Sequence, residues 1–93
     1  MIREYVAECY WPDVREDDLE ELDARAAAAA GDLVAAGESI RYLGSLLMRA
    51  DEVVLCVFEG SEAAVLAAAE RAQLPFERIL ESALSHWPRA VNP

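Results

Sequence analysis

Residues Glu52 to Glu59 read Glu-Val-Val-Leu-Cys-Val-Phe-Glu, a run of six apolar residues between two acids. The run is rich in β-branched and aromatic residues and is followed by Gly60-Ser61, which is typical of a strand buried on both faces. Such a strand lies in the centre of a sheet. Helices that cover one face of a sheet leave the other face open, so we expect a second copy of the chain to cover it.

Five further elements are predicted around this central strand. Alternating polarity predicts strands at residues 3–11, 38–49 and 78–87, and apolar residues at helical spacing predict helices at 15–36 and 62–73. The order strand, helix, strand, strand, helix, strand favours a ferredoxin-like α+β sandwich, with a four-stranded antiparallel sheet and both helices on one face. The chain is then a single domain, residues 1–93, with a core at about 3–87 and a loose tail at 88–93.

Regular alternation assigns the side chains of the second strand to two faces. One face is predicted to hold Ile40, Tyr42, Leu46 and Met48, and the other Arg41, Leu43, Ser45, Leu47 and Arg49. Gly44 interrupts the first of these rows. A short turn at Ala50-Asp51 then leads back into the central strand, so the two strands should form an antiparallel hairpin.

The charge balance excludes several kinds of partner. The chain has 18 acidic and 8 basic side chains and a net charge of -10, which repels nucleic acid and anionic membranes and attracts cations. No apolar run approaches the roughly 20 residues of a membrane span. Because the amino terminus does not resemble a signal peptide, a cytoplasmic location is expected. Cys9 and Cys56 lie in apolar strand patterns, and buried packing is favoured over a disulfide.

Several segments resemble a family of small bacterial proteins of unknown function. They are Ile40-Arg41-Tyr42-Leu43-Gly44-Ser45, Val54-Leu55-Cys56-Val57-Phe58-Glu59, Ala64-Val65 and Leu74-Pro75-Phe76-Glu77-Arg78-Ile79. The best-described member of this family is an actinobacterial nickel-binding protein with a dimeric ferredoxin-like fold. The resemblance covers roughly residues 3–85 and implies the same fold, a homodimer and a role in binding nickel. Relatives often carry histidines at the positions of Gly44 and Ala68, and this chain lacks both.

Two sets of candidate site residues follow, and no catalytic residue is assigned. Glu8 stands between apolar neighbours on a predicted inner strand, where it is a candidate cation ligand or general base, or else a partner of Arg41 or Arg49. The ligand-binding candidates are Glu8, Tyr10, Tyr42 and Ser45. The metal-binding candidates are Glu8, Cys56 and His86; His86 is the only imidazole in the chain and is expected close to Glu4.

Three functions are compatible with these residues. The leading hypothesis is a small homodimeric protein that binds a divalent metal such as nickel, or a small ligand, at the open sheet face near Glu8, Ser45 and Cys56. An alternative is a cofactor-independent oxygenase or isomerase of the dimeric α+β barrel type, which requires a closed apolar cavity with an ionisable group. The third is a pure protein-interaction domain, with the sheet face filled by its partner.

Overall fold

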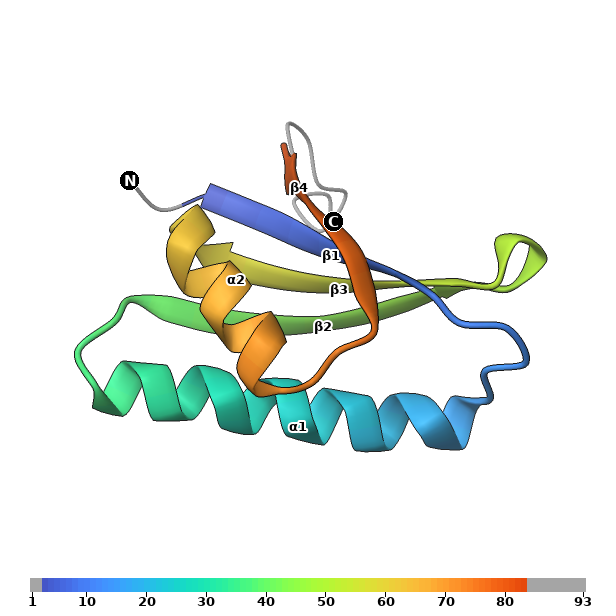
Figure 1. Ribbon diagram of the computed structural model, residues 1–93, viewed down its shortest axis with the longest axis horizontal. Coiled ribbons are helices and arrows are strands. Elements are labelled where there is room, and N and C mark those ends of the chain that lie inside the picture. Colours follow the sequence, from blue (N-terminus) through green and yellow to red (C-terminus); the bar gives the residue numbers. More distant parts are fainter. Residues whose placement is uncertain (1–2, 84–93) are drawn as a thin grey trace, which may run out of the picture.

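The computed structural model describes residues 3–83 and confirms the predicted α+β fold (Figure 1). The elements are, in chain order, β1 (Arg3–Tyr10), α1 (Glu16–Ala35), β2 (Ile40–Met48), a short 3-10 turn (Arg49–Asp51), β3 (Val53–Gly60), α2 (Glu62–Arg71) and β4 (Phe76–Ser82). The four strands form one antiparallel sheet in the order β2-β3-β1-β4. This is the ferredoxin-like arrangement, and the apolar run within residues 52–59 lies in its inner strand β3.

The amino terminus of each helix is capped by side chains at or next to its first turn. The Asp18 carboxylate accepts a hydrogen bond from the Arg15 amide at 2.9 Å, and acids fill the first turn of α1, where the helix dipole favours them. Ser61 is the N-cap of α2, and its hydroxyl oxygen accepts a hydrogen bond from the Ala64 amide at 3.1 Å. Each helix is therefore capped by residues close to it in sequence.

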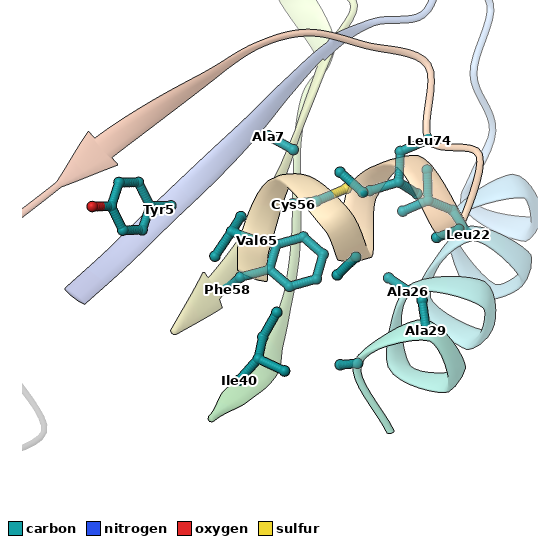
Figure 2. Close-up of a cluster of buried hydrophobic side chains, with 14 of the residues drawn as sticks. Tyr5, Ala7, Leu22, Ala26, Ala29, Ile40, Cys56, Phe58, Val65 and Leu74 are labelled. Atoms are coloured by element: carbon teal, nitrogen blue, oxygen red, sulfur yellow. The ribbon is translucent and has the colours of Figure 1, made fainter. Parts of the chain in front are cut away.

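The core lies between the sheet and the two helices. Phe58 of β3 packs beside Val65 of α2, while Leu22 of α1 reaches the same cluster from the other helix (Figure 2). All three side chains are fully buried. The alanines of both helices let the backbones approach the sheet closely, and α1 runs along β2 while α2 crosses in front of the inner strands (Figure 1). One face of the sheet is thus covered within a single chain.

A bulge in β2 makes the predicted faces of that strand wrong. Tyr42 pairs with Phe58, but the next partner of β3, Val57, pairs with Gly44, so Leu43 is an extra residue. Gly44 has a backbone φ of +137°, which favours glycine. Beyond the bulge, Leu46 and Met48 lie on the open face, whereas Ser45 lies on the helix side opposite Cys56.

The last strand also differs from its prediction. It begins at Phe76, two residues earlier than expected, and ends at Ser82. It pairs antiparallel with β1, with Ser82 opposite Glu4. The remainder of the predicted strand, including His86, lies outside the described residues.

Candidate binding site on the open sheet face

A row of polar side chains crosses the sheet on the face turned away from the helices. Direct cross-strand partners on neighbouring strands define it: Arg41 of β2 opposes Glu59 of β3, Glu59 opposes Glu4 of β1, and Glu4 opposes Ser82 of β4. Opposed residues in an antiparallel sheet project from the same face with their Cβ atoms about 5 Å apart. We call these four residues the acidic row.

The acidic row carries an excess of negative charge. Arg41 Nη2 lies 3.4 Å from Glu59 Oε1, and no salt bridge to Glu4 forms within residues 3–83. Two carboxylates directly opposite each other repel, and a single guanidinium balances only one of them. The row therefore favours a cation, which the overall charge of the chain also favours.

An open hollow of about 680 Å³ lies over the acidic row and the apolar residues next to it. Its lining residues are Glu4, Val6, Arg41, Leu43, Gly44, Ser45, Leu46, Val57, Glu59 and Ser82. The volume is in the range of pockets that hold small ligands. One end of the hollow is thus charged and the other is apolar.

Glu8 lies on the same face, but its carboxylate pairs with Arg78 and not with Arg41 or Arg49, the partners predicted from the sequence. Arg78 Nε lies 2.6 Å from Glu8 Oε1, and this contact raises the pKa of Arg78. Arg49 pairs with Glu16 instead. Because Glu8 follows Glu4 by four residues along a strand, their Cα atoms are about 13 Å apart, too far for both carboxylates to bind one metal ion.

The remaining candidates lie on the helix side of the sheet. Cys56 is fully buried, and contact with Cys9 together with burial raises the pKa of its thiol, so it remains protonated at neutral pH. The Tyr42 hydroxyl donates a hydrogen bond to Asp23 Oδ1. The pKa of Tyr42 is raised, mainly by burial of the phenol and also by this hydrogen bond. Ser45 contacts Tyr42 and also borders the hollow at the bulge.

The structure thus separates the residues that the sequence grouped together. Glu8 and Tyr10 lie on the open face, while Tyr42 and Cys56 lie on the helix side. No group of three His, Cys, Asp or Glu side chains is placed to hold a metal ion within residues 3–83. Sequence reasoning did not select Glu59, because only the strand register shows that it faces Glu4.

The comparisons with known proteins agree with this fold. A family model described as nickel responsive protein SCO4226-like matches residues 5–81. The chain belongs to this family. The resemblance found in the sequence is therefore confirmed.

Among solved structures, the chain is similar to SCO4226 from Streptomyces coelicolor A3(2), with a TM-score of 0.73 and 22% sequence identity. The match covers 89% of this chain and 99% of that one, so the two share their fold over nearly their whole length. A search of curated proteins gives no match. Neither helix in the described part of the chain has the length and apolar character needed to span a membrane.

Proposed function

We propose that this protein is a small homodimeric metal-binding protein that takes a divalent cation such as nickel at the acidic row. The observation that carries the proposal is the direct opposition of Glu4 and Glu59 in an open hollow, where Arg41 pairs with Glu59 and no salt bridge to Glu4 forms within residues 3–83. The nickel-responsive description of the family supports nickel as the ion to test first. Carboxylates bind divalent first-row metals, although such ions prefer imidazole.

His86 supplies the missing imidazole in this proposal. It follows Ser82 by four residues, and four residues of extended chain span up to about 14 Å. Glu4 lies one strand from β4 and Glu59 two strands, at about 5 and 10 Å, so both are within reach. Glu8 and Cys56, the other sequence candidates, are set aside as ligands because Arg78 holds the first and the core encloses the second.

The homodimer forms through the other end of the open face. Apolar side chains gather there on three adjacent strands, and we call these five residues the apolar end: exposed Tyr10, Leu46 and Met48, and half-buried Val53 and Leu55. A second copy that packs against this end removes the apolar surface from water and covers the sheet that the helices leave open.

Calorimetric titration of untagged, metal-stripped protein with nickel, zinc and cobalt tests the metal site. Wild-type protein should bind with whole-number stoichiometry, and Glu4→Gln, Glu59→Gln and His86→Gln should each weaken nickel binding by about tenfold or more. Glu70→Gln is the matched control, because this exposed acid lies on α2, away from the open face. Absence of binding, or full affinity in Glu4→Gln, would refute the acidic row as the site.

The apolar lining of the hollow favours a second candidate, the binding of a small apolar ligand. Val6, Leu43 and Val57 form that part of the lining, and the carboxylates beside them would be the ionisable groups of an oxygenase or isomerase. Within residues 3–83 the hollow is open to solvent, so such chemistry requires a second copy to close it. Saturable binding of an apolar fluorescent probe, abolished by Val57→Arg, would support this candidate.

A further inference from the structure

The hollow on the open face has two chemically different walls that lie side by side. Glu4 and Glu59 oppose each other on β1 and β3, and two residues further into the sheet Val6 opposes Val57. All four side chains line the hollow of about 680 Å³. Residues two apart on a strand project from the same face about 7 Å apart, so a molecule that lies on the valines can place one end between the carboxylates.

We propose that this hollow binds a small primary amine with an apolar body, an alkylamine or arylalkylamine in its protonated form. The ammonium group lies between Glu4 and Glu59, and the apolar body lies on Val6 and Val57. This inference depends on the hollow being a ligand site, which is the second function proposed above, and it requires no metal.

The carboxylate wall provides acceptors for the donors of an ammonium group. An ammonium has three N–H donors, and the acceptors are the carboxylates of Glu4 and Glu59 and the hydroxyl of Ser82, which opposes Glu4. Arg41 takes only part of this capacity, because its guanidinium lies 3.4 Å from one oxygen of Glu59 and its side chain is 70% exposed. An ammonium therefore finds its acceptors among the described residues alone.

The apolar wall sets the size of the ligand. Val6 and Val57 are half-buried, and Leu43, the extra residue of the bulge in β2, is 42% exposed beside them. A short alkyl chain or a single ring that covers these side chains removes their surface from water. A longer body would continue onto Leu46 and Leu55, which oppose each other in the apolar end. A small ligand therefore leaves the proposed interface with a second copy free.

Charge and lining together select the class of amine. The net charge of -10 favours a cation and repels a carboxylate with the same apolar body. Within residues 3–83 no aromatic side chain lines the hollow, so a quaternary ammonium gains no cation–π contact there. A quaternary ammonium also lacks the N–H groups that donate to carboxylates. A primary amine should therefore bind more tightly than its trimethylated analogue.

Titration of full-length, metal-free protein with hexylamine, followed by nuclear magnetic resonance, tests the site. Saturable binding should shift the methyl resonances of Val6 and Val57. Glu4→Gln and Glu59→Gln should each weaken hexylamine binding by about tenfold, because each replaces a charged acceptor of the ammonium by a neutral one. Glu70→Gln on α2 is the matched control and should bind as the wild type does.

Three further ligands separate a small amine from its alternatives. Hexyltrimethylammonium lacks N–H donors and hexanoate has the opposite charge, so each should bind about tenfold more weakly than hexylamine. A short peptide with a central lysine presents the same ammonium on a polypeptide. It should also bind more weakly, because the open face presents side chains, and no backbone groups, to the peptide bonds that it would cover.

Several results would overturn the proposal. They are no saturable binding of hexylamine, equal affinity for hexanoate or hexyltrimethylammonium, and full affinity in Glu4→Gln. Shifts confined to Tyr10 and Met48 would place the amine on the apolar end instead, and tighter binding of the lysine peptide would assign the site to a partner protein.

Failure of this inference is distinguishable from failure of either proposed function. These titrations contain no metal, so they do not depend on nickel binding, which calorimetry measures separately. If the apolar fluorescent probe binds and Val57→Arg abolishes its binding while hexylamine does not bind, the hollow is a ligand site and only the assignment of an amine is wrong.

Discussion

At the scale of single residues, the contact between Tyr42 and Asp23 joins two elements that the sequence does not relate. The phenol projects from the edge strand β2 and donates to a carboxylate on α1. It also stacks at a tilt on Phe58, with ring centroids 5.0 Å apart. Tyr42 was a candidate ligand residue in the sequence, and its contacts in the structure are those of a side chain that fastens α1 to the sheet.

This contact predicts how stability depends on alkaline pH. Burial and the bond to Asp23 raise the pKa of Tyr42, so above the ordinary value of 10.0 the unfolded chain releases a proton that the folded chain keeps. Stability should therefore fall as the pH rises from about 9 to 11, and it should fall less steeply in Tyr42→Phe. Denaturant unfolding measures the slope. Identical slopes for Tyr42→Phe and wild type would contradict the prediction.

At the scale of elements, the bulge in β2 decides which side chains form the open face. A single extra residue, Leu43, reverses the alternation, so Leu46 and Met48 point away from the helices and Ser45 points toward them. Gly44 permits the bulge, because its φ of +137° is rarely adopted by residues with a side chain. The composition of the proposed interface thus depends on one glycine.

Two glycine substitutions should change stability in opposite directions. An added Cβ at Gly44 has free space, so Gly44→Ala should destabilise the fold by about 1–2 kcal/mol through backbone strain alone. Gly31 lies inside α1, and a Cβ there meets nothing within 4 Å, so Gly31→Ala should stabilise by about 0.5–1 kcal/mol. Urea unfolding of both variants checks the pair. Equal effects of the same sign would mean that the bulge strain is absent.

At the scale of the whole molecule, the helices cover one face of the sheet and the other remains partly exposed (Figure 1). Val53, Leu55 and Val57 of β3 are half-buried on that face, although their sequence predicted a strand buried on both sides. Their burial is incomplete within residues 3–83, and the predicted second copy would bury them further. The family relationship gives the fold, and the dimer remains a prediction.

A charge on the apolar end should therefore separate the two copies. Leu46→Arg places a guanidinium on a side chain that is 57% exposed on the open face, and desolvating it in the interface would be costly. Sedimentation velocity at micromolar concentration should show a shift from dimer to monomer. Leu66→Arg is the matched control, since this exposed leucine lies on α2, and it should leave the dimer intact. A wild-type monomer near 10.2 kDa would refute the interface.

The fold was accessible from the sequence because its signals are local. The apolar run at β3, the helical spacing of the apolar residues and the cap at Ser61 each depend on residues close together in the chain. The family resemblance pointed to the same fold. The limits of the elements differ from their predictions by only a few residues in the described range.

The candidate site was decided by tertiary structure. Glu4 and Glu59 are 55 positions apart in the sequence, and only the register of β1 against β3 makes them neighbours. The bulge at Leu43 likewise cannot be derived from alternation, because an extra residue is visible only as a shift in pairing with β3. Patterns along a chain show which side chains are apolar. Which charged side chains become neighbours on adjacent strands depends on the register, and the register is set by the pairing of segments that are distant in the sequence.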